Sequence, residues 1–217
     1  MGEGERETWT TEEFGTSHEG AVGVVLADGS VPAPVFFDMS PGGGGQAVSQ
    51  WSTYDGRYPR VPRAAALRAV CSCGWTGPAH ELDWDQIGDQ ALTEAAGGTA
   101  DICTRDWDTH TAEVDRSTIP LPETFTNLLA QLVTEIETLA KTSPLAALRA
   151  ARQLEVTAAR AAYWPAHQAR QDTTPEQAAN ALGLNEDAAR KLMARFGDWS
   201  LCHSEPLRDG HRSSDGL

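Results

Sequence analysis

The sequence predicts an α+β protein, in which a small antiparallel sheet with a zinc site is followed by an all-α helix-turn-helix module. Three observations predict it. Short β-branched runs alternate with glycine- and proline-rich turns in the first half, a Cys-x-Cys pair stands at 71 and 73, and helical periodicity takes over after residue 120. The 217 residues suffice for one large or two small domains with real cores.

The predicted strands begin after a glutamate-rich stretch. Residues 1–20 carry many acidic and few apolar side chains, which predicts a disordered acidic leader. An α+β, zinc-binding module is expected over 21–116. Within it, apolar runs on both sides of Asp28-Gly29 predict a hairpin. Two more strands are predicted at 47–54 and at about 64–71.

Helical signals follow the cysteines. Residues 99–114 can form a helix with Thr99 as its N-cap. A proline-bearing joint at 117–124 is the predicted domain boundary, and a linker and helix are expected over 117–142. Apolar residues recur in that helix at spacings of four and three: Phe125, Leu129, Leu132, Ile136 and Leu139. A seam of two heptads favours packing within the monomer, with a homodimer as the alternative.

A helix-turn-helix module is predicted over 143–200, in which Ser143 and Pro144 begin a helix as its N-cap and first helical residue. Thr174 and Gln177 form a capping box in front of one helix, and Asn185 can cap the next, over 186–196. Gly183 stands between them, where the chain must turn through a left-handed conformation. Residues 201–217 are polar and predict a flexible tail.

The segment TTPEQAANALGLNEDAARKLMARFG, residues 173–197, resembles the helix-turn-helix modules of bacterial regulators. The resemblance implies that its second helix enters the major groove of double-stranded DNA. The side chains expected to face the duplex are Asn185, Glu186, Arg190, Lys191 and Arg195. Glu186 and Asp187 depart from the Ser, Arg or Gln of many such modules, and both carboxylates also stabilise the start of a helix.

The cysteines raise the question of a metal site. On a strand, Cys71 and Cys73 would point to the same face, so their thiolates can share one tetrahedral zinc ion. The remaining ligands are predicted to be His110 and His80. Cys103, Cys202 and His203 are the other candidates, and buried structural cysteines or a redox pair remain alternatives.

The chain also resembles a family of uncharacterised actinobacterial proteins. The shared elements are W-x-x-Y-D-G-R, C-x-C-G-W-x-G and W-x-x-H, followed by a C-terminal helix-turn-helix module, over about residues 50–197. Trp107 and His110 fit the W-x-x-H element, which favours His110 as a ligand. The resemblance implies architecture more than activity.

The distribution of charge limits the possible functions. Residues 1–140 hold 7 Lys and Arg against 22 Asp and Glu, a net −15, whereas residues 141–217 hold 10 against 9, a net +1. If the chain binds nucleic acid, we therefore expect its C-terminal part to contact the phosphates. We expect a DNA-binding transcriptional regulator whose acidic module contacts a protein partner, and a protein-protein adaptor that binds no DNA is the alternative.

Enzymatic and membrane functions are not expected. The chain has no nucleophile-elbow, phosphate-loop or HExxH motif, and only a zinc ion with three protein ligands would offer a route to catalysis. No apolar run approaches the length of a membrane span, and the first residues lack the apolar stretch of a secretory signal. These features predict a cytoplasmic protein.

Overall fold

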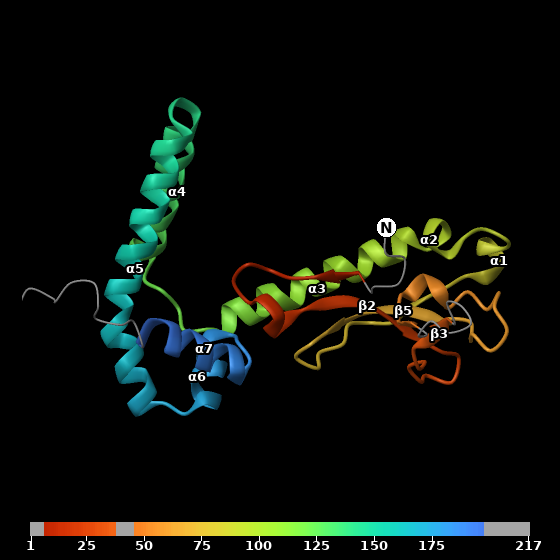
Figure 1. Cartoon of the computed structure of the whole chain (residues 1–217). Coiled ribbons are helices and arrows are strands. Elements are labelled where there is room, and N and C mark those ends of the chain that lie inside the picture. Colours follow the sequence, from red (N-terminus) through yellow and green to blue (C-terminus); the bar gives the residue numbers. More distant parts are fainter. Residues whose placement is uncertain (1–6, 38–45, 198–217) are drawn as a thin grey trace, which may run out of the picture. The chain divides into compact units, whose positions relative to one another are not determined.

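The computed structural model describes residues 7–37 and 46–197, and it confirms the α+β class (Figure 1). The chain divides into two compact units. The first comprises residues 1–120 together with 179–188, and the second comprises residues 121–178 together with 189–217. The predicted module at 143–200 does not coincide with either unit, because the turn between its last two helices belongs to the first.

A four-stranded antiparallel sheet forms the centre of the first unit. The strands lie in the order β1 (Thr8–Trp9), β2 (Gly20–Val25), β5 (Ala66–Cys71) and β6 (His80–Glu81). In the central pair, Gly20 lies opposite Cys71 and Val25 lies opposite Ala66. This pairing joins segments that are far apart in the sequence.

The predicted hairpin at Asp28-Gly29 is wrong. The turn itself forms, and Asp28 accepts hydrogen bonds from the Ser30 backbone N–H and hydroxyl. The next strand, β3 (Val35–Phe37), pairs instead with β4 (Gln46–Val48) in a separate two-stranded sheet. Pro32 and Pro34 precede β3 and lack the N–H groups that would extend a ladder with β2.

Of the other two strands predicted in this region, one is shorter than predicted and one is confirmed. The strand predicted at 47–54 is short, because a 3₁₀ turn at Trp51–Thr53 follows β4. The strand predicted at about 64–71 is confirmed as β5.

The predicted disordered leader is wrong for residues 7–20. Thr8 and Trp9 form β1, and a 3₁₀ turn, Gly15–His18, leads into β2. Phe14, Ser17 and His18 are buried in this segment. Residues 1–6 and the predicted tail at 201–217 lie outside the described residues.

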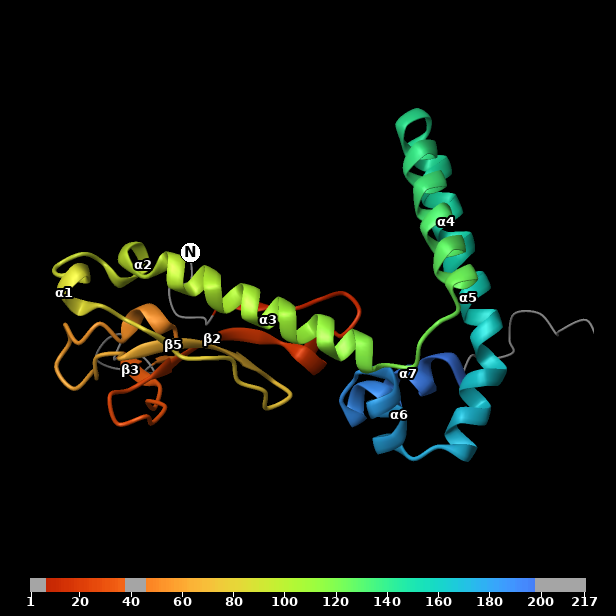
Figure 2. The same cartoon turned by 180° about the vertical axis from the view of Figure 1, so that it is seen from behind.

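Helix α3 (Gly97–Ser117) runs along the sheet and packs against β2 and β5 (Figures 1 and 2). It follows two short helices, α1 (Trp84–Ile87) and α2 (Leu92–Ala95). The helix begins at Gly97, two residues before the predicted N-cap Thr99, and Ala96 takes the N-cap position. The core between helix and sheet includes Val22, Val24, Leu67, Ala69, Cys103 and Trp107.

The second unit contains a helical hairpin. Helix α4 (Glu123–Thr142) and helix α5 (Pro144–Asp172) pack against each other and are joined at Ser143. Ser143 is the N-cap of α5 and Pro144 occupies its first turn, as the sequence predicts. Among the described helices, none is long and apolar enough to cross a membrane.

The predicted helix-turn-helix is formed by α6 (Pro175–Leu182) and α7 (Glu186–Gly197). The Thr174 backbone N–H donates to the Gln177 side chain, and the Gln177 backbone N–H donates to the Thr174 hydroxyl, which completes the capping box. Asn185 caps α7 by accepting from the Ala188 backbone N–H at 2.8 Å. Gly183 has φ of +63°, the left-handed turn that the sequence predicts.

Candidate metal centre

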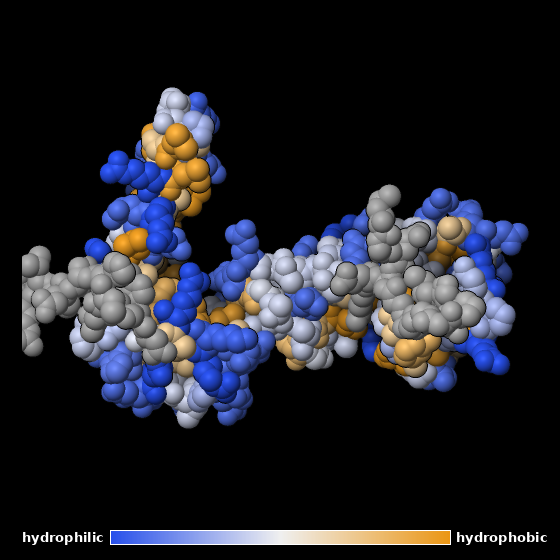
Figure 3. Space-filling view, in the orientation of Figure 1, coloured by the Kyte–Doolittle hydropathy of each residue, from blue (hydrophilic) through white to orange (hydrophobic). Residues whose placement is uncertain are grey.

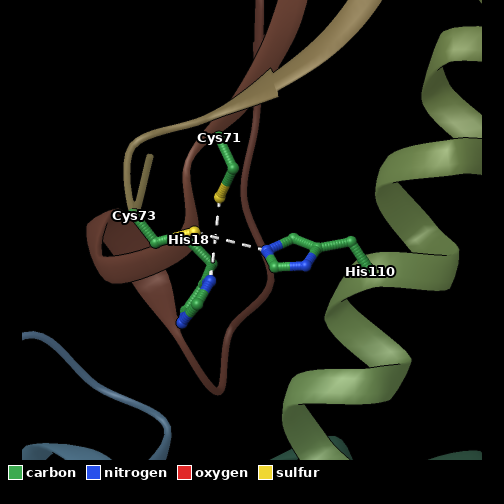
Figure 4. A group of neighbouring side chains, drawn as sticks. All are labelled: His18, Cys71, Cys73 and His110. Atoms are coloured by element: carbon green, nitrogen blue, oxygen red, sulfur yellow. Dashed lines mark hydrogen bonds between the residues drawn. The ribbon is translucent and has the colours of Figure 1, made fainter. Parts of the chain in front are cut away.

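Four side chains converge at one end of the central sheet: His18, Cys71, Cys73 and His110 (Figure 4). Their ligand atoms all lie within 4.8 Å of one another. His18 ends the 3₁₀ turn before β2, Cys71 ends β5, Cys73 lies in the following turn, and His110 projects from α3. Three separate parts of the first unit therefore meet at this group, which could hold a metal ion.

The register of the sheet brings His18 to the cysteines. Because Gly20 lies opposite Cys71 in an antiparallel pair, continuing the chain by two residues in each direction brings His18 towards Cys73. Ser72 fixes this approach. Its hydroxyl donates to the Thr16 carbonyl at 2.9 Å and accepts from the Glu19 backbone N–H at 2.9 Å.

The turn that carries Cys73 is closed by backbone hydrogen bonds. The Gly74 N–H donates to the Cys71 carbonyl, and the Cys71 N–H donates to the Trp75 carbonyl, each at 2.9 Å. Gly74 has φ of +93°, a conformation that residues with a side chain rarely adopt. Cys71 is buried and Cys73 is exposed, so the group is open to solvent on the Cys73 side.

The distances within the group suit ligands of one ion. Cys71 Sγ lies 3.7 Å from His18 Nδ1, and Cys73 Sγ lies 3.4 Å from His110 Nε2. The ring of His110 stacks on Trp75 with centroids 4.3 Å apart and planes at 5°. That stacking fixes the orientation of the imidazole, and the nitrogen that faces Cys73 is the one a metal would take.

The two histidines of the group are in the neutral form that can bind a metal. Burial lowers the pKa of His18, although a hydrogen bond from its ring to the Gly183 backbone acts in the opposite direction. Burial also lowers the pKa of His110, and the nearby His18 lowers it further. Both imidazoles are therefore neutral at pH 7, the form that binds a metal.

The Cys73 thiol is also neutral when no metal is bound. Burial raises the pKa of Cys73, and its neighbour Cys71 adds to that rise. In the absence of an ion this group keeps its proton at neutral pH. Because a thiol binds a metal as the thiolate, binding would release the Cys73 proton, so metal affinity is expected to rise with pH.

The structure does not place the predicted ligand His80 in the metal-ligand group. The Nε2 atom of His80 lies instead 2.7 Å from a carboxylate oxygen of Asp106. His80 forms β6 on the far side of β5 from β2, so the sheet order places it away from His18. His18 takes the place that was predicted for His80.

The other candidate ligands are not in the group either. Cys103 is fully buried in the core, and burial raises its pKa to about 11, so it remains a thiol. Cys202 and His203 lie outside the described residues. The predicted ligands Cys71, Cys73 and His110 do come together.

Glycine permits the close approach of α3 to the site. A Cβ atom at Gly20 would lie 2.5 Å from the indole of Trp107, one helical turn before His110. No side chain fits there without displacing α3. Trp107 itself is buried and lies 5.9 Å from the ring of Trp9, so the predicted W-x-x-H element supplies one core residue and one member of the metal group.

The turn of the helix-turn-helix packs beside His18. A Cβ atom at Gly183 would lie 2.9 Å from ring carbon Cε1 of Phe14 and 2.9 Å from Cγ2 of Thr118. The Ile119 backbone N–H donates to the Ala181 carbonyl at 2.9 Å. Residues 179–188 thus belong to the same compact unit as the metal group.

The residues predicted to contact DNA are all exposed. Asn185 precedes α7, and Glu186, Arg190, Lys191 and Arg195 lie along it. At 100° per residue, the four helical positions fall within one half of the helix surface. Ala189 and Met193 are buried on the other half. The helix thus presents both carboxylates and basic groups on its exposed side.

Comparison with protein-family models, with curated proteins and with solved structures gives no match for this chain.

Proposed function

We propose that the protein is a zinc-stabilised, DNA-binding transcriptional regulator that contacts duplex DNA through α7. The observation that carries the proposal is the capped helix, glycine turn and second helix of α6 and α7, with Arg190, Lys191 and Arg195 exposed along one side of α7. Such a helix can lie in a major groove with its polar side against the bases and phosphates. A bacterial protein of this kind would act in the cytoplasm.

The chemistry of the ligands supports zinc as the metal. Two thiols and two imidazoles are the donors of structural zinc sites, which are tetrahedral. With Zn–S of about 2.3 Å and Zn–N of about 2.0–2.1 Å, adjacent sulfur and nitrogen ligands lie about 3.6 Å apart. The 3.7 Å and 3.4 Å separations in the group bracket that distance. Four protein ligands leave no open position for water, which favours a structural role over a catalytic one.

The proposed zinc centre supports the helix-turn-helix through His18. A metal-bound histidine commonly donates its other ring N–H to a backbone carbonyl, which fixes its orientation. The hydrogen bond between the His18 ring and the Gly183 backbone provides such a partner. Loss of the ion would free His18, which lies 5.4 Å from the ring of Phe14. Because Phe14 packs on Gly183, we expect DNA affinity to fall when zinc is removed.

Duplex DNA binding can be tested by titrating affinity against salt. A regulator should show log affinity falling steeply with log salt, with a slope of about −0.9 per phosphate neutralised. Replacing Arg190 and Lys191 together with alanine should abolish specific binding, reduce the slope by about 2 and leave the fold intact. Alanine at Arg105 and Arg116, which are exposed on α3, removes the same charge elsewhere and serves as the control. Equal loss of affinity in both double variants would contradict the assignment of α7.

A protein-protein adaptor is the second candidate. Glu186 and Asp187 lie in the first turn of α7, and the chain carries a net charge of −14. Carboxylates at the groove-facing end of the helix and an acidic first half both oppose contact with phosphate. An adaptor would bind no duplex DNA at low salt, which separates it from the regulator.

A further inference from the structure

Helix α4 is 20 residues long and has no buried residue. Its apolar side chains are instead exposed to a large degree: Phe125 by 50%, Leu128 by 57%, Leu129 by 41%, Leu132 by 42%, Val133 by 54% and Leu139 by 36%. A helix is normally stabilised by burying its apolar face, because its own hydrogen bonds and propensities are marginal in water. The partner helix α5 covers only part of this face.

The exposed apolar residues of α4 form one continuous face. At 100° per residue they fall within an arc of about 140°, wider than one antiparallel neighbour can cover. Leu145 and Leu148 extend the apolar surface onto α5, where they are 80% and 66% exposed. Figure 3 shows hydrophobic side chains gathered along the α4–α5 hairpin. We call this surface the hairpin face.

The size of the hairpin face suits a protein-protein interface. Its eight large apolar side chains leave on the order of 700 Å² exposed, close to the 800 Å² or so that each partner buries in a standard interface. Continuous apolar patches of this size are rare on monomers and mark interaction surfaces. The face is therefore large enough for a specific dimer.

The two helices of the hairpin carry opposite net charges. Helix α4 carries three glutamates and one lysine, whereas α5 carries four arginines against one glutamate and one aspartate. If two hairpins meet about a two-fold axis, the acidic helix of each can lie against the basic helix of the other. An arrangement of this kind attracts a second copy and needs no other protein.

We propose that the hairpin face binds a second copy of this chain, so that α4 and α5 of two protomers form a four-helix bundle. Antiparallel helical hairpins with a heptad-spaced apolar seam assemble in this way, because four helices enclose a core that two cannot. The inference goes beyond the proposed function and does not depend on DNA or metal binding. In the dimer, each protomer would contribute one helix-turn-helix.

The test is the mass of the full-length chain in solution. Sedimentation velocity should give twice 23.3 kDa at micromolar concentration. Glutamine at both Leu128 and Val133 should raise the dimer dissociation constant at least about 100-fold, because each change removes apolar area in both protomers. Both side chains are more than half exposed in the single chain, so the substitutions cost the monomer little.

A second variant and a control complete the experiment. The double variant Leu145→Gln, Leu148→Gln removes the part of the hairpin face that lies on α5. It should also be monomeric, with unchanged helix content. Alanine at Asn127 and Gln131, which are exposed on the other side of α4, should leave the dimer intact. A chain that is monomeric at 100 µM or so overturns the proposal, since interfaces of this size give at least micromolar affinity. A dimer that resists both glutamine variants overturns it too, and a monomer that binds another protein on this face would assign the face to that protein.

Discussion

Replacing His18 with glutamine tests the ligand that the fold assigns and the sequence did not suggest. His18 is buried, and its Nδ1 faces Cys71 Sγ at 3.7 Å. Glutamine is close to histidine in length and polarity, but its amide is a poor ligand for zinc. The substitution therefore removes one of four proposed ligands while it preserves much of the packing.

The expected loss follows from the number of ligands. Structural zinc sites contribute about 10–16 kcal/mol of apparent binding free energy at pH 7, so one ligand in four accounts for roughly 3 kcal/mol. A loss of this size weakens zinc binding by about 100-fold or more. Because zinc binds the folded state, the melting temperature at fixed zinc concentration should fall with it.

The assay is competition with a chelator, and His80 provides the control. His80 pairs with Asp106, and both side chains are 25% exposed, so glutamine at His80 should leave zinc affinity unchanged and cost about 1 kcal/mol of stability. Equal effects of the two substitutions, or a stronger effect at His80, would refute the ligand assignment.

Three further predictions concern the same unit. The Cys71→Ser variant should bind no stoichiometric zinc and should melt at a lower temperature. The Cys103→Ser variant should lose about 1–3 kcal/mol of core stability but keep its zinc content. Elemental analysis of the two variants measures this difference in zinc. The Gly183→Ala variant should lose about 1–2 kcal/mol of folding stability, because the left-handed backbone and the neighbouring side chains leave no room for a Cβ atom. A melting curve identical to that of the parent protein would contradict the packing of the turn. The chelated protein should lose stability as the pH falls below about 6.5. The pKa values of His18 and His110 are lowered in the folded state, so the unfolded state binds more protons between about pH 6.5 and those folded values. A melting temperature that stays constant from about pH 7 to 5.5 would count against this prediction.

Local signals in the sequence were enough to predict where α5, α6 and α7 begin and how the chain turns between α6 and α7. The capping box at Thr174, the left-handed Gly183 and the Asn185 cap are decided by residues within four positions of each other, and all three are confirmed. The same holds for Ser143 and Pro144 at the start of α5. Such interactions form within a single turn, so no knowledge of the tertiary fold is needed.

Long-range pairing could not be predicted in the same way. Asp28-Gly29 forms a turn, but the strand that follows it, β3, pairs with β4 and not with β2. The partner of β2 is β5, which begins about 40 residues after β2 ends. Because β2 pairs with β5, His18 lies close to the cysteines at the end of β5. From composition alone, His18 falls in a predicted disordered leader. Strand pairing, and no motif around His18, therefore brings His18 into the group that could hold a metal ion.

The most direct test of the proposed zinc centre is X-ray absorption at the zinc edge of the purified, full-length protein. We expect one zinc ion per chain with two sulfur ligands at about 2.3 Å and two imidazole nitrogens at about 2.0–2.1 Å. A first shell of any other composition, or protein that is fully folded with no stoichiometric zinc, would contradict the account.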